Sequence, residues 1–160
     1  MFKIGDYITH PMHGAGVIES IVTKKINGSQ RDYYVLKLPV GDMVVMVPVS
    51  GCEDIGVRSI ISRSEAEKLF GAFSEIEISM TQNWNKRYRE NIDKIKSGNL
   101  LDVASVVKGL MCRDSERGLS TSERKMLHSA KQILISELVI ATDMDYDGVE
   151  KRLCAALKEG

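Results

Sequence analysis

The segment from Asn83 to Arg89 carries the residue types best suited to binding a charged polymer. It contains Trp84, the only tryptophan of the chain, followed closely by Lys86, Arg87 and Arg89. A large flat apolar ring beside positive charges can contact phosphates and insert between bases, so the pattern is typical of a nucleic-acid surface. The same ring could equally be a core residue at the start of a helix.

A second pair of cations, Arg124 and Lys125, follows the segment Ser120-Thr121-Ser122-Glu123. A serine three residues before a glutamate fits a capping box and predicts that a helix starts at Thr121. Cations in a first turn oppose the helix dipole. The free amides of that turn and the two side chains could, however, bind one phosphate together. We therefore expect Arg124 and Lys125 to belong to a phosphate-binding surface.

Two other patterns resemble metal sites but lack ligands. His10 and His13 offer two nitrogens, and no third ligand stands at a suitable spacing. The segment from Asp143 to Gly148 begins like a calcium loop, but Cys154 stands where the loop requires a glutamate. No grouping typical of a nucleophilic site is present. We expect no enzyme activity, no metal, no cofactor and no small-molecule ligand.

The composition is that of an ordinary globular protein with no net charge. The 160 residues are 43 % hydrophobic and 28 % charged, with 22 basic and 22 acidic side chains. A free-standing, non-specific DNA binder is normally much more basic. Cations outnumber anions between Trp84 and Lys131, although a solvated helical face could produce the same excess. Any nucleic-acid contact must therefore be local, or be helped by a second anchor.

The cysteines and the hydropathy pattern indicate a cytoplasmic protein. Cys52, Cys112 and Cys154 are far apart and odd in number, which favours free thiols in a reducing compartment. The first residues do not resemble a signal peptide, and no apolar run reaches the roughly 18 residues that span a bilayer. We expect no membrane contact.

The first 60 residues predict short antiparallel strands joined by tight turns. Asn27-Gly28 is a strong signal for a hairpin turn, because both central positions of a type I′ turn need a positive φ. The pattern predicts a small, strongly bent sheet or barrel. The strand Met43–Val47 is apolar on both faces, so it is either buried on both sides or an edge that awaits a partner. Lys24 and Lys25 beside the turn are either a solvated tip or a contact for an acidic surface.

The remaining chain predicts about five helices. Their expected ranges are a first helix capped by Ser64 with Glu67 and ending near Phe73, a second over 83–96, a third over 100–113, a fourth over 121–142, and a last one beyond a turn at 143–148. A polar loop is expected over 114–119. In the second helix the apolar stripe Trp84, Tyr88, Ile92 and Ile95 places Trp84 in line with the buried face.

Taken together, these segments resemble the CarD/CdnL family of bacterial transcription regulators over nearly the whole chain. The resemblance rests on Phe2-Lys3-Ile4-Gly5-Asp6, His10-Pro11-Met12-His13-Gly14, Tyr34-Val35-Leu36-Lys37, Val47-Pro48, Asn83-Trp84-Asn85-Lys86-Arg87-Tyr88, Arg113-Asp114-Ser115-Glu116-Arg117-Gly118-Leu119-Ser120 and Glu123-Arg124-Lys125-Met126-Leu127. It implies an α+β chain with two domains: a Tudor-like antiparallel β-barrel or sheet at 1–60, and an all-α domain at 64–160.

The resemblance also implies a function in transcription initiation. The first domain is similar to the polymerase-interacting domain of transcription-repair coupling factors, which implies binding to the RNA polymerase β subunit. The residues implied are Lys24, Met43, Val44, Val45, Met46 and Val47. The helical domain is implied to contact promoter DNA at the upstream edge of the −10 element and to stabilise the open complex. The residues implied are Trp84, as a minor-groove wedge, with Lys86, Arg87, Arg89, Arg124 and Lys125.

One departure and one alternative accompany the resemblance. Members of the family carry an arginine in the fourth strand where this chain has Met46, which favours backbone pairing and apolar contact with polymerase over a salt bridge. The alternative is a stand-alone Tudor-like module that binds protein or RNA. Such a reader needs an aromatic cage, and the adjacent Tyr33 and Tyr34 point to opposite faces of a strand. We expect a monomer located at the nucleoid through polymerase.

Overall fold

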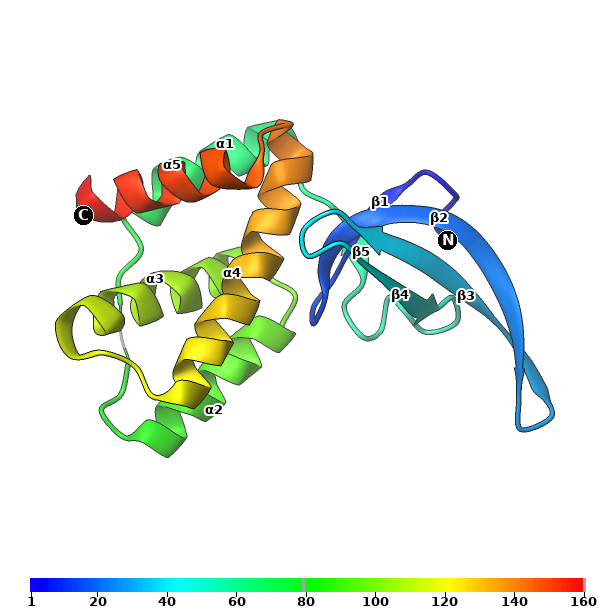
Figure 1. Cartoon of the computed structure of the whole chain (residues 1–160), viewed down its shortest axis with the longest axis horizontal. Helices are drawn as coiled ribbons and strands as arrows, with labels where there is room; N and C mark the ends of the chain where they lie inside the picture. Colours follow the sequence, from blue (N-terminus) through cyan, green and yellow to red (C-terminus); the bar gives the residue numbers. More distant parts are fainter. Residues whose placement is uncertain (79, 160) are drawn as a thin grey trace.

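The structure, a computed structural model, describes residues 1–78 and 80–159 and is of the α+β class, as predicted (Figure 1). Five antiparallel strands come first and five helices follow. The strands are β1 (Tyr7–His10), β2 (Gly14–Ile26), β3 (Ser29–Leu38), β4 (Met43–Pro48) and β5 (Arg58–Ser59). They form one sheet in the order β4-β3-β2-β1-β5. The sheet is open, so of the predicted barrel or sheet it is the sheet that forms.

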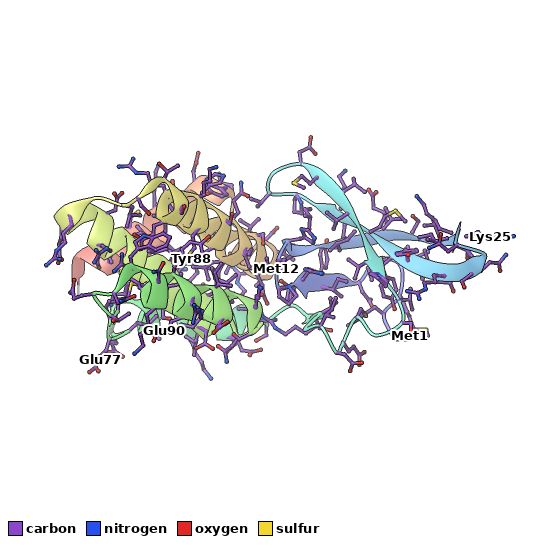
Figure 2. The ribbon with its side chains drawn as sticks, turned by 90° about the horizontal axis from the view of Figure 1, so that it is seen from below. Met1, Met12, Lys25, Glu77, Tyr88 and Glu90 are labelled. Carbon is purple, nitrogen blue, oxygen red and sulfur yellow. The ribbon has the colours of Figure 1, made fainter. Side chains whose placement is uncertain are left out.

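The long β2–β3 hairpin ends in the predicted tight turn. Asn27 and Gly28 have φ values of 49° and 81°, the positive angles that a type I′ turn requires. The register of the two strands shifts between Ile18 and Ser20, and such a bulge increases the local bend of a strand. The hairpin carries Lys24 and Lys25 to one end of the molecule, and Figure 2 shows Lys25 there.

The helices agree with the prediction in number, and three of their ends differ. One of these is the start of the last helix, which begins at Tyr146, inside the turn predicted over 143–148. The bounds of the helices are α1 (Arg63–Phe73), α2 (Trp84–Lys96), α3 (Leu100–Arg117), α4 (Thr121–Thr142) and α5 (Tyr146–Glu159). The predicted cap of α1 is wrong: Ser62, not Ser64, caps it in a capping box with Glu65. The predicted loop over 114–119 is also largely helical, since α3 continues to Arg117 and ends at Gly118 with φ 78°. The predicted connection before α2 includes Ser79, which lies outside the described residues.

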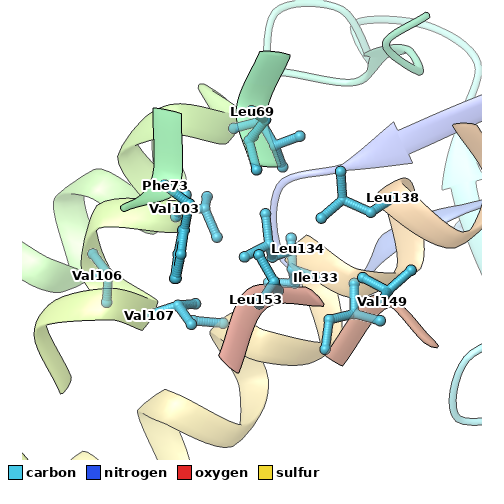
Figure 3. Close-up of a cluster of buried hydrophobic side chains, with 14 of the residues drawn as sticks. Leu69, Phe73, Val103, Val106, Val107, Ile133, Leu134, Leu138, Val149 and Leu153 are labelled. Atoms are coloured by element: carbon cyan, nitrogen blue, oxygen red, sulfur yellow. The ribbon is translucent and has the colours of Figure 1, made fainter. Parts of the chain in front are cut away.

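The helices enclose one large apolar cluster (Figure 3). Leu134 of α4 lies near its centre, with Phe73, Leu138 and Leu153 around it. Residues 133–138 of α4 are buried without a break. The reason is that α4 packs against other helices on one side and against β2 on another. A smaller cluster fills the bent face of the sheet.

Polar contacts fasten the sheet to α4. The Arg58 guanidinium donates to both carboxylate oxygens of Glu137, at 2.8 and 3.0 Å, and the Ile61 amide donates to the same carboxylate at 2.8 Å. The Ala15 amide donates to Ser136 Oγ at 2.9 Å. A side chain at Gly14 would collide with Ser136, so glycine is needed for this close approach. These contacts fix the position of the helices relative to the sheet.

Candidate nucleic-acid interface

The N-termini of α2 and α4 lie side by side, and together they form the candidate interface (Figure 1). Asn83 caps α2 by accepting the Lys86 amide. Ser120 caps α4 by accepting the Glu123 amide. Only half of the predicted capping box forms at Ser120, because the Glu123 carboxylate turns to Arg87 instead of the cap backbone. Segments distant in sequence thus meet at one end of the helical part.

Trp84 is partly exposed at this end. The residue is 41 % exposed, and its ring stacks on Tyr88, with ring centroids 5.1 Å apart and planes 17° from parallel. The indole Nε1 donates to Ser120 Oγ at 3.3 Å. The indole therefore has one face supported by the protein and another available to a ligand. Figure 2 shows Tyr88 on α2.

The buried face of α2 differs from the predicted stripe. Its buried residues are Arg87, Asn91 and Ile95, whereas Tyr88 and Ile92 are only partly buried and Trp84 is exposed. Arg87 can occupy a buried face here because it finds an anionic partner on α4. Asn91 has no such partner, and its buried Nδ2 makes no hydrogen bond within the described residues. Of the predicted stripe, Ile95 is buried as expected, Tyr88 and Ile92 pack at the edge of the core, and only Trp84 is exposed.

Arg87 is the main correction to the predicted DNA-binding set. Its side chain is 2 % exposed and pairs with the equally buried Glu123, with Nε 2.8 Å from Oε2 and Nη2 3.2 Å from Oε1. Its Nη1 donates to the carbonyls of Thr81 and Gln82. The hydrogen bonds from Arg87 lower the pKa of Glu123 below its usual range, so the carboxylate stays ionised. A guanidinium so fully occupied is not free to bind a phosphate.

The other predicted cations are exposed. Lys86 and Arg89 lie on the outer side of α2, and Arg124 and Lys125 lie in the first turns of α4. Arg124 Nε donates to the Leu119 carbonyl at 3.2 Å, which holds that side chain near the start of its helix. These four exposed cations lie on two helices, and the buried Arg87 is not among them.

Arg117 also belongs to this end, although it was absent from the predicted set. It is exposed in the last turn of α3, and its Nη1 donates to Gln82 Oε1 at 3.2 Å, just before α2. With 114–119 expected to be a loop, the sequence did not place Arg117 at the end of a helix. A usable signal was available, because cations favour the C-terminal turn of a helix and Gly118 marks the helix end.

The predicted polymerase-binding residues lie on the opposite part of the molecule. β4 is an edge strand, which is one of the two predicted alternatives, and Met43, Val44 and Met46 are 52 %, 59 % and 38 % exposed. Lys24 is exposed near the hairpin tip. Val45 is half-buried. Val47 is buried in the sheet core, so only its backbone is available to a partner.

The remaining candidates carry no site. The rings of His10 and His13 lie 4.6 Å apart, but within residues 1–78 and 80–159 no group of three or more His, Cys, Asp or Glu side chains could hold a metal ion. Tyr34 is buried in the sheet core, which removes it from any aromatic cage. No helix in the described part of the chain is long and apolar enough to cross a membrane.

The two parts of the chain match the two domains of one family of transcription factors. The CarD-like/TRCF RID domain matches residues 2–61, and the CarD C-terminal domain matches residues 68–154. The chain therefore belongs to the CarD family, whose members are generally not enzymes. The RID match implies an interaction with RNA polymerase.

A curated relative agrees with this assignment. The chain is 39 % identical over 140 residues to the Bacillus subtilis (strain 168) protein named "Putative transcription factor YdeB". The match covers 88 % of this chain and 92 % of that protein, so it extends over both the sheet and the helices.

Proposed function

We propose that the chain binds the RNA polymerase β subunit through the sheet and promoter DNA through the ends of α2 and α4. The DNA contact is placed at the upstream edge of the −10 element, where it stabilises the open complex during initiation. In this proposal residues 1–60 form the polymerase-binding domain and residues 64–160 form the DNA-contacting domain. The observation that carries it is a half-exposed tryptophan beside exposed cations at two adjacent helix N-termini.

The neutral charge of the chain fits a tethered DNA contact. A domain held on polymerase meets promoter DNA at an effective concentration that can reach the mM range. A few phosphate contacts then suffice, and the candidates are Lys86, Arg89, Arg117, Arg124 and Lys125. The hydrogen bonds between Arg58 and Glu137 join the helices to the sheet, which favours keeping the DNA contact close to the sheet on polymerase.

Trp84 supplies the preference for melted DNA. Unstacking a base step costs a few kcal/mol, and an apolar ring that fills the gap offsets part of that cost. A ring that fits the melted state better than the duplex shifts the equilibrium by its differential affinity, and about 1.4 kcal/mol is tenfold. Stacking on Tyr88 supports this role because it holds the ring rigid before DNA arrives.

The polymerase contact uses the free edge of the sheet. β4 leaves one side of its backbone unpaired and exposes Met43, Val44 and Met46. An exposed apolar edge strand is suited to adding a strand from a partner. Lys24 at the hairpin adds a charge for an acidic group on the same partner.

Trp84→Ala tests the DNA part of the proposal. The lifetime of the open complex with bacterial polymerase should shorten while co-purification with polymerase persists. An unchanged lifetime in a folded Trp84→Ala protein would contradict the wedge.

Val44→Asp combined with Lys24→Glu tests the polymerase part. The variant should lose co-purification with the polymerase β subunit, because both changes place negative charge on the proposed contact. Leu101→Asp is the matched control, since Leu101 is also exposed and apolar, at 51 %, but lies on α3. If the double variant binds as well as the control does, the surface is wrongly assigned.

A further inference from the structure

We infer that the buried Arg87–Glu123 pair is a positioning device that fixes the orientation of Trp84. The inference rests on the proposed function, in which Trp84 acts on DNA. Arg87 and Glu123 do not touch DNA in this account. They act through a continuous set of hydrogen bonds that ends at the indole.

The hydrogen bonds run from the start of one helix to the start of the other. Arg87 donates two hydrogen bonds to the Glu123 carboxylate through Nε and Nη2. Its third nitrogen, Nη1, donates to the carbonyls of Thr81 and Gln82. Its guanidinium therefore joins α4 to the backbone just before α2. Because Trp84 is the first residue of α2, this backbone sets the direction in which the indole leaves the helix.

Ser120 connects the pair to the indole itself. Its Oγ accepts the Glu123 amide at 3.2 Å and donates to Glu123 Oε1 at 3.4 Å. The same Oγ accepts the Trp84 Nε1–H at 3.3 Å. The ring is thus held by a hydrogen bond at one edge and by Tyr88 on one face. A shift of the carboxylate would move the serine and the indole together.

The choice of an ion pair at this position supports an orienting role. Removing two charges from water is costly, so a buried pair adds little stability over well-packed apolar side chains. What the pair adds is geometry, because a planar guanidinium binds a carboxylate in one bidentate arrangement. Arg152 and Glu67 make a similar bidentate pair between α5 and α1, but they are about half exposed and no hydrogen bond of the described residues links them to Trp84.

The single tryptophan makes the inference measurable without DNA. The test protein is the full chain carrying Arg87→Met and Glu123→Leu, which replaces both charges and leaves neither unpaired. The time-resolved fluorescence anisotropy of Trp84 should gain a fast component, and acrylamide should quench the fluorescence more strongly. The control Arg152→Met with Glu67→Leu removes the exposed pair and should leave both signals unchanged.

The effect on transcription is measured with the same proteins. The open-complex lifetime is measured with the protein bound to polymerase at a promoter. The Arg87→Met and Glu123→Leu protein should shorten this lifetime nearly as much as Trp84→Ala does. Polymerase co-purification should stay normal. A folded variant with unchanged anisotropy and an unchanged lifetime overturns the inference.

If the double change prevents folding, a second variant tests whether hydrogen bonds orient the indole. Ser120→Ala removes the acceptor of the indole at an exposed position and should mobilise Trp84 in the same way. If Ser120→Ala leaves the anisotropy unchanged, the connection from the pair to the indole does not exist. The proposed function fails separately, when Trp84→Ala itself leaves the lifetime unchanged, and the anisotropy then still decides whether the pair positions the ring.

Discussion

The free edge of the sheet and the paired starts of α2 and α4 contrast in chemistry. β4 presents Met43, Val44 and Met46 with an unpaired backbone edge, which suits a protein strand. The helix starts present Trp84 among exposed cations, which suits a nucleic acid. In a chain with no net charge, the proposed apolar contact and the proposed basic contact thus lie on different elements.

The two regions also differ in what lies beneath them. An ordinary apolar cluster supports the sheet edge, with Val47 and Leu36 facing inward. A buried ion pair supports the helix starts. The Arg58–Glu137 pair at the junction keeps the two regions in a fixed relation. The contrast indicates that side-chain geometry is specified more tightly at the proposed DNA contact than at the proposed polymerase contact.

Arg87→Met should give the largest loss of stability, because it removes one half of the buried ion pair beneath the helix starts. It leaves the Glu123 carboxylate buried without its partner, which typically costs about 3–5 kcal/mol. Arg89→Met, two residues along on the exposed side of α2, should change stability by no more than about 0.5 kcal/mol. Urea unfolding followed by circular dichroism compares the two. Equal losses of stability would mean that Arg87 does not stabilise the starts of α2 and α4.

Glu137→Leu should have an intermediate effect at the junction. It removes the acceptor of the partly buried Ile61 amide and of Arg58, and one unsatisfied donor costs at most about 1–3 kcal/mol, the value for a fully buried one. Arg58 is one-third exposed, so water can satisfy part of it. Urea unfolding measures the loss, and small-angle X-ray scattering should detect a wider spread of shapes. An unchanged scattering profile in a destabilised protein would show that other contacts fix the junction.

Lys125→Gln should have the smallest effect and sharpens the assignment of the basic surface. If Lys125 binds one phosphate, the slope of log K against log salt for promoter binding by the polymerase complex should fall by about 1. Lys151→Gln is the control, because Lys151 is exposed on α5. An identical slope for both variants and the parent protein would remove Lys125 from the interface.

Local signals predicted most of the fold. Asn27-Gly28, Asn83 and Ser120 each act through their own neighbours, so the hairpin, the start of α2 and the bounds of α4 could be predicted from sequence. The start of α1 was misassigned because Ser62 with Glu65 and Ser64 with Glu67 offer the same spacing two residues apart. Glu67 is instead used by Arg152, a partner 85 residues away.

The candidate site was less predictable, because the burial and exposure of its residues depend on partners that are far away in the sequence. Arg87 resembles Lys86 and Arg89 in the sequence, and only Glu123, 36 residues later, makes it a buried residue. Trp84 was placed on the correct helix, but its exposure depends on Ser120 and on the adjoining start of α4. Periodicity predicts the face of a helix and does not predict which polar residues find partners within it.

The most direct test of the central claim is photocrosslinking from position 84. Trp84 is replaced by p-benzoylphenylalanine in the full chain, which is bound to polymerase in an open complex and irradiated. A second protein carries the same group in place of Leu101, which follows the far end of α2. The account predicts crosslinks from position 84, and none from position 101, to promoter nucleotides at the upstream edge of the −10 element. Crosslinks from position 84 to protein alone would contradict it.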